Sequence, residues 1–330
     1  MPAGHRHEGA YRRLMLSSMA AMLASIAVCV SATSEPATVT EAFVTNQTGD
    51  SLTVVSLADM KPVAEIAIGG KPAGIAMSAD GKFAYLTSPE SKELVVVDAG
   101  VRQVANRFKV GEAPLGIAAH PTNGRVYVAD WFTHKISVVD PAAGKVVAEI
   151  AVGDSPSGLA VTPDGKLLLS ADRDSDAVSI IDVAKNVRTA TVSVGKRPFG
   201  ITIDAAGMRA YTANVASDDV SIIDVASGKL IGTVPVGHRP YAVALAGQHA
   251  YVTNQYASTL SVIDIGSLKV VQTIPVGDHP EGIAVDPAGA NVYVACWFDN
   301  VLMRIDTAKM AVTGEAAVGD GPRAFGLFLR

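Results

Sequence analysis

Residues 276–296 read VGDHPEGIAVDPAGANVYVAC, and this stretch returns in modified form throughout the chain. Its first part is a Val-Gly-x-x-Pro-x-Gly-Ile-Ala phrase. The first glycine of that phrase recurs as Gly69, Gly111, Gly153, Gly195, Gly237, Gly277 and Gly319. Successive copies are 42 residues apart, except at the fifth step, which is 40. A constant period of this length indicates a repeat architecture.

The second part is a Tyr-Val-Thr-Asn-like phrase with the same spacing. Its last residue is Asn46, Ser88, Asp130, Asp172, Asn214, Asn254 and Cys296 in the seven copies. Each unit holds four short runs rich in Val, Ile and Tyr, with no helical period. Turn dipeptides such as Asp80-Gly81 separate the first two runs, as a hairpin requires. The sequence therefore predicts an all-β, seven-bladed β-propeller with four antiparallel strands per blade.

The ends of the repeat array predict how the ring closes. The array begins with the second run of a unit, at residues 41–46, and ends with a first run, at residues 323–329. Seven complete blades form only if the C-terminal strand pairs with the N-terminal strands, which also removes an open sheet edge. We expect a single propeller domain over residues 41–330.

The N-terminal region has the pattern of an export signal. Arg6, Arg12 and Arg13 precede an apolar stretch at residues 14–30, and small residues follow it. We predict a signal peptide at 1–32, a short linker at 33–40 and a periplasmic or secreted protein with no stable membrane anchor after cleavage. The general secretory and twin-arginine routes both remain open.

Composition argues against several classes of function. The 330 residues are 49% apolar, carry a formal net charge of −5 and contain no run of Lys or Arg. A nucleic-acid partner is not expected, because such a surface needs a basic patch. The two cysteines cannot form a disulfide framework or a four-cysteine zinc site.

The two repeated phrases, with their 42-residue step, resemble the YVTN-type β-propeller repeat family over about residues 41–329. This family is related to the seven-bladed β chains of quinoprotein amine dehydrogenases. The resemblance implies an exported propeller that serves as an accessory subunit of a periplasmic redox system. The chain departs from the pattern at Leu169, Ala242 and Ala324.

Function must depend on positions that differ between copies, because repeated residues serve turns and packing. We expect the loop before each inner strand and the loop after each Tyr-Val-Thr-Asn phrase to lie on one face. The candidate residues for a ligand or partner there are Trp131, Phe132, Arg197, Phe199, His238, Arg239, Tyr241, Tyr256, Glu281, Trp297, Phe298 and Arg323. The two Trp-Phe pairs should face each other across the ring, or else cap their own blades.

Two functional classes remain open. The favoured one is a non-catalytic propeller that binds a protein or small ligand on this face and needs no cofactor. The alternative is an enzyme, either a metal-assisted hydrolase or lyase or a dehydrogenase subunit, with its site at the channel mouth. In that case His238, His279 and Glu281 are candidate ligands for a divalent metal, because imidazole and carboxylate suit such ions. A thiol at Cys296 activated by His279 is a weaker catalytic hypothesis.

Overall fold

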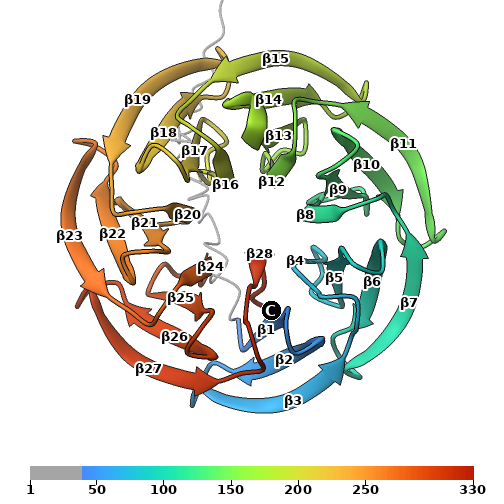
Figure 1. Cartoon of the computed structure of the whole chain (residues 1–330), viewed down its shortest axis with the longest axis horizontal. Coiled ribbons are helices and arrows are strands. Elements are labelled where there is room, and N and C mark those ends of the chain that lie inside the picture. The colour runs from blue at the N-terminus through green and yellow to red at the C-terminus, as the bar shows by residue number, and fades with distance from the viewer. Residues whose placement is uncertain (1–38) are drawn as a thin grey trace, which may run out of the picture. The chain divides into compact units, whose positions relative to one another are not determined.

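A computed structural model describes residues 39–330 of the chain. The predicted signal peptide, and the predicted linker up to residue 38, lie outside this part. Seven sheets are arranged in a ring, and we call the space at its centre the channel. In six sheets one strand lies at the centre and another at the rim, and β28 lies at the centre beside the sheet of β1, β2 and β3 (Figure 1). Within residues 39–330 the one helical element is a short 3-10 turn, η1 (Arg173–Ser175). The predicted all-β propeller of seven four-stranded blades is confirmed.

The strands follow one another in chain order around the ring. The first four sheets contain β1 (Glu41–Asn46), β2 (Ser51–Ser56), β3 (Lys61–Ala67); β4 (Gly74–Met77), β5 (Phe83–Ser88), β6 (Glu93–Asp98), β7 (Gln103–Lys109); β8 (Pro114–Ala119), β9 (Val126–Asp130), β10 (Lys135–Asp140), β11 (Lys145–Ala151); β12 (Pro156–Val161), β13 (Leu167–Asp172), β14 (Ala177–Asp182), β15 (Val187–Ser193). The remaining strands are β16 (Pro198–Ile203), β17 (Arg209–Asn214), β18 (Asp219–Asp224), β19 (Lys229–Pro235); β20 (Pro240–Ala246), β21 (His249–Asn254), β22 (Thr259–Asp264), β23 (Lys269–Pro275); β24 (Pro280–Val285), β25 (Asn291–Cys296), β26 (Val301–Asp306), β27 (Ala311–Ala317) and β28 (Phe325–Leu327).

Burial explains the composition of each blade. The second and third strands are covered on both faces by neighbouring blades, so nearly every residue of β13 and β14 is buried, including the polar Ser170, Asp172 and Ser179. The outer strands alternate between covered and exposed residues, as in β11. Lys61 and Lys145 begin two of these outer strands, where a charged side chain discourages pairing with another chain.

The second glycine of the Val-Gly-x-x-Pro-x-Gly-Ile-Ala phrase permits close approach of adjacent blades at the channel. A Cβ atom at Gly116 would lie 1.6 Å from the carbonyl oxygen of Ser157, and one at Gly74 would lie 2.2 Å from that of Leu115. Neither distance can be met by a real side chain. Backbone packing between inner strands therefore requires glycine at these two positions, whereas Ala242 and Ala324 occupy the equivalent position in two other copies.

The C-terminal segment closes the ring as predicted. It runs antiparallel to β1: Phe43 N–H donates to Phe328 O, and Arg330 N–H donates to Glu41 O, both at 2.8 Å. One feature was not predicted. β28 also pairs in parallel with β4 of the next blade, because the short strand lies between the inner edges of two blades (Figure 1). A search of the described residues for a helix long and apolar enough to cross a membrane finds none.

Candidate functional site

One end of the channel gathers the variable loops, and we call it the mouth face. Here the residue after the Tyr-Val-Thr-Asn phrase donates its backbone N–H to the carbonyl before the repeat's proline in six of the seven copies; the exception is Pro89, which has no N–H. Examples are Gln255 to Arg239 at 2.9 Å and Trp297 to His279 at 3.0 Å. The expectation that both sets of loops share one face is thus confirmed.

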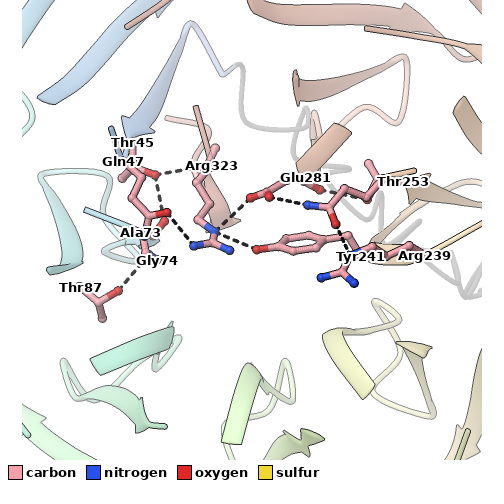
Figure 2. Close-up of polar contacts among 12 residues, drawn as sticks. Thr45, Gln47, Ala73, Gly74, Thr87, Arg239, Tyr241, Thr253, Glu281 and Arg323 are labelled. Atoms are coloured by element: carbon pink, nitrogen blue, oxygen red, sulfur yellow. Dashed lines mark hydrogen bonds and ion pairs between the residues drawn. The ribbon is translucent and has the colours of Figure 1, made fainter. Parts of the chain in front are cut away.

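Two sets of equivalent positions surround the mouth. The inner ring consists of the residues after the repeat's proline: Ala73, Leu115, Ser157, Phe199, Tyr241, Glu281 and Arg323. The outer ring consists of the residues after the Tyr-Val-Thr-Asn phrase: Gln47, Pro89, Trp131, Arg173, Val215, Gln255 and Trp297. Where the phrase has threonine, its side chain holds the next inner-ring residue: Thr253 Oγ1 donates to Glu281 O at 3.0 Å and Thr45 Oγ1 donates to Ala73 O at 2.9 Å (Figure 2). Four of the seven copies have alanine at this position and make no such bond.

A largely buried polar network connects five ring residues (Figure 2). Arg323 Nε lies 3.0 Å from Glu281 Oε2 and donates to the Tyr241 hydroxyl at 2.9 Å. Arg323 Nη1 donates to Gln47 Oε1 at 2.8 Å, so this one guanidinium joins the C-terminal segment to the blades of β1, β20 and β24. Gln255 Nε2 donates to Glu281 Oε1 at 2.6 Å. Charge-assisted contacts of this kind fix side-chain positions closely.

Burial and ion pairing set the protonation of this network. Burial raises the pKa of Glu281, and the charge of Arg323 opposes that rise. Burial also raises the pKa of the Tyr241 hydroxyl, which therefore stays neutral. Burial alone would lower the pKa of Arg323, but the charges and hydrogen bonds of Glu281 and Tyr241 together outweigh it, so the pKa is raised and the guanidinium stays charged.

Aromatic side chains fill the channel next to this network. Phe199 lies at the centre, with ring centroids 4.5 Å from Tyr241, 4.9 Å from Phe325 and 6.1 Å from Trp131. Trp131 therefore contacts the aromatic side chains that fill the channel. Trp297 instead packs against Arg323, whose guanidinium carbon lies 5.6 Å from the Trp297 ring centroid. The two tryptophans do not form a matched pair across the ring, because the side chains between them differ from blade to blade.

The residues that follow the tryptophans face solvent. Phe132 and Phe298 are 70% and 60% exposed. Phe298 packs edge-on against His279, with ring centroids 4.4 Å apart, and the Tyr256 ring centroid lies 5.3 Å from that of the same imidazole. Arg239 covers Tyr256, with its guanidinium carbon 4.6 Å from the ring centroid. This part of the mouth face is an exposed aromatic strip.

The three candidate metal ligands have separate partners. His238 Nδ1 lies 3.0 Å from Asp218 Oδ2, His279 Nδ1 lies 2.9 Å from Asp278 Oδ1, and Glu281 contacts Arg323. Over residues 39–330, no group of three His, Cys, Asp or Glu side chains could hold a metal ion. The structure does not bring the proposed ligand set together.

The Cys296 thiol is not arranged for nucleophilic chemistry. It is fully buried, and burial raises its pKa to about 12, so it stays protonated at neutral pH. No hydrogen bond joins it to His279 in the part of the chain that the structure describes. Cys296 instead packs among apolar side chains between blades.

Three arginines stand together beside the aromatic side chains, and sequence reasoning identified two of them, Arg197 and Arg239. It missed Arg173, whose guanidinium lies 5.2 Å from the Trp131 ring centroid. Burial lowers the pKa of Arg173, Asp174 opposes this, and the like charges of Arg197 and Arg239 lower it further. Arg173 occupies the same repeat position as Trp131 and Trp297. Comparing all seven copies of that position would have found it, together with Gln47 and Gln255.

Fold and mouth face together define a seven-bladed β-propeller whose channel is filled at one end by aromatic side chains and an ion pair. Residues 211–328 match the YNCE-like beta-propeller family model. None of the curated proteins matches the chain.

Solved structures share the fold. A chain of Kuenenia stuttgartiensis hydrazine synthase is similar with a TM-score of 0.75 and 24% identity, over 82% of this chain and 93% of that one. A functionally unknown protein from Desulfotomaculum acetoxidans DSM 771 is similar with a TM-score of 0.75 and 17% identity, over 87% of this chain and 99% of that one. At these identities the likeness shows the fold alone.

Proposed function

We propose that this chain is an exported, non-catalytic β-propeller that binds a protein or small ligand on its mouth face. The observation that carries this proposal is the break in the repeat at the two rings. Backbone contacts there repeat from blade to blade, while side chains change from Ala73 and Ser157 to Phe199 and Arg323. Variation on a constant scaffold is the usual arrangement of a recognition surface.

The chemistry of the mouth face supports binding rather than catalysis. Glu281 and Arg323 neutralise each other, and the Cys296 thiol stays protonated. Exposed aromatic and arginine side chains, such as Tyr256 and Arg239, are the types that contribute most energy at binding surfaces.

The proposal also covers the cellular location of the protein and its role there. The pattern at residues 1–32 supports export, and the likeness of the two repeated phrases to the YVTN-type family supports an accessory role in a periplasmic redox system. The match of residues 211–328 to a propeller family model is compatible with this assignment.

Site-specific photo-cross-linking in the native cells tests the proposal. A photoreactive phenylalanine analogue is placed at Phe298, on the mouth face, and in the control at Met208, in the turn between β16 and β17 at the other end of the channel. Both side chains are well exposed. Molecules released from the purified protein on denaturation are identified by mass spectrometry.

Adducts formed from position 298 but not from 208, or a stoichiometric released molecule, are the expected result. Equal amounts of adduct from both positions would overturn the proposal. So would the absence of adducts from position 298 together with the absence of any released molecule. A stoichiometric metal lost on changing His279 to alanine would favour the enzyme alternative instead.

A further inference from the structure

We infer that the loops carrying Arg173, Arg197 and Arg239 form a binding site for a small molecule with a carboxylate or phosphate group. This inference deepens the proposed function, because it names a ligand class for the mouth face. The three arginines come from three separate loops: one follows β13, one precedes β16 and one precedes β20. The fold, rather than a local motif, brings their charges together.

The carboxylates nearby leave a positive excess. Asp174 is the acidic side chain shared by the cluster, with Oδ1 at 2.7 Å from Arg173 Nη1 and 3.8 Å from Arg197 Nε. Asp176 is engaged elsewhere, since it accepts from the Arg197 backbone N–H at 2.8 Å and pairs with Lys196 at 2.7 Å. Among the described residues, the guanidinium groups of Arg173 and Arg197 thus share one directly paired carboxylate, and Asp174 has no ion pair with Arg239.

Asp218, beside the third arginine, is engaged in the same way as Asp176. It accepts from the Arg239 backbone N–H at 2.8 Å and contacts His238 at 3.0 Å. These two aspartates hold Arg197 and Arg239 in a left-handed backbone conformation, with φ of 54° and 57°. Their carboxylates therefore shape the loops and do not pair with the guanidinium groups of the cluster.

The arginines are held in position but retain free donors. Arg173 is held over Trp131 and is only 18% exposed, while Arg239 Nε donates to Gln255 Oε1 at 2.5 Å. Each guanidinium has five N–H donors, and the contacts within residues 39–330 use few of them. Planar, preorganised guanidinium groups suit the two oxygens of a carboxylate or phosphate.

A hollow adjoins the cluster. It measures about 490 Å³ and is lined by Arg173, Asp174, Asp176, Lys196, Arg197 and Ala216. This volume lies within the range of small-molecule sites. A ligand larger than a bare ion therefore fits, with its anionic group at Arg173 and its body in the hollow.

Calorimetric titration of the full protein with inorganic phosphate, and separately with citrate, in low-chloride buffer tests the inference. We expect saturable 1:1 binding that weakens by about tenfold or more in Arg173→Gln and in Arg197→Gln. Arg197 is 55% exposed, so its variant should fold even if the Arg173 variant does not. Arg209→Gln, at the opposite end of β17, is the matched control and should bind as the wild type does.

Tryptophan fluorescence locates the bound anion. Because Arg173 lies over Trp131, binding should change the emission of Trp131. The change should persist in Trp297→Phe and vanish in Trp131→Phe. Selective binding of phosphate or of citrate identifies the anionic group.

Binding that does not saturate, or that Arg209→Gln weakens equally, would show the inference to be wrong. If neither anion binds but cross-linking from position 298 succeeds, the anion site fails and the proposed function stands. If an anion binds at Arg173 while cross-linking and the search for released molecules both fail, the anion site stands without the wider proposal.

Discussion

The mouth of the propeller has two unlike arcs. In the small arc the inner-ring residues are Ala73, Leu115 and Ser157, and in the large arc they are Phe199, Tyr241, Glu281 and Arg323. All seven occupy the same place in the repeat. Phe199 extends across the channel to Trp131, a residue of a small-arc blade. A channel filled at native packing density needs small side chains on one side where the other side is large.

The arcs also differ in how their loops are held. In the small arc, Asp130 and Asp172 occupy the last position of the Tyr-Val-Thr-Asn phrase, and Asp130 accepts backbone N–H groups from Glu112 at 2.6 Å and Phe132 at 3.1 Å. In the large arc the same position is Asn214, Asn254 and Cys296. At this position two of the three small-arc blades therefore use a carboxylate, and the third has Ser88, whereas these large-arc blades use an amide or a thiol and hold their loops with other carboxylates, such as Asp218, and with the inner-ring network.

Removing the ion pair of the large arc should have the largest effect. Arg323→Met leaves the carboxylate of Glu281, which is 4% exposed, without its cation, and should lower the free energy of unfolding by about 3–5 kcal/mol. Urea denaturation measures this. The double variant Arg323→Met/Glu281→Leu should recover most of the loss. A single variant as stable as the wild type would mean that the network does not hold the arc together.

Truncating the inner-ring side chain should lower the stability of the protein more in the large arc than in the small arc. Phe199→Ala opens a cavity and should cost about 3–5 kcal/mol. Ser157→Ala, at the equivalent position of the small arc, removes a hydrogen bond to Ala171 O at 2.9 Å and should cost about 1 kcal/mol. Thermal and urea unfolding of the two variants give the comparison. Equal losses would contradict the idea that the large side chains fill the channel for both arcs.

Exchanging the loop-holding residue tests the other difference. Asp130→Asn introduces the large-arc residue and removes the charge from hydrogen bonds to at least two backbone N–H groups. We expect a loss of about 1–2 kcal/mol in stability, and a larger loss for Asp130→Ala. Hydrogen exchange of the loop at residues 130–134 should accelerate in both variants. If only global stability changes, Asp130 does not order this loop.

Acid sensitivity should show the smallest effect, and we expect two carboxyl groups in turns of the small arc's blades to contribute to it. Hydrogen bonds from Ser78 and Thr162 are the leading causes that lower the pKa of Asp80 and Asp164 from 3.8 to about 2. A lowered folded-state pKa stabilises the protein above pH 4, and this contribution is lost as the pH falls from about 4 to 2. The melting temperature of Asp80→Asn/Asp164→Asn should therefore fall less over this range than that of the wild type. An unchanged pH profile would contradict this.

Much of the site was predictable from the repeat positions. Phe199, Tyr241, Glu281 and Arg323 follow the repeat's proline and do gather at the mouth. Their partners were not predictable: Glu281, proposed as a metal ligand, instead contacts Arg323. That contact joins the last repeated phrase to the one before it, and it depends on how the folded chain packs the two phrases together.

The sequence alone determined the number of blades, the strands within each and the closing segment, because these depend on periodic turns and apolar runs that each unit carries. The tertiary structure alone decided that Arg173 joins Arg197 and Arg239 and that Phe199 reaches Trp131. These contacts connect side chains of different blades, and they depend on the channel radius and on the volume of every other ring residue. No single repeat contains that information.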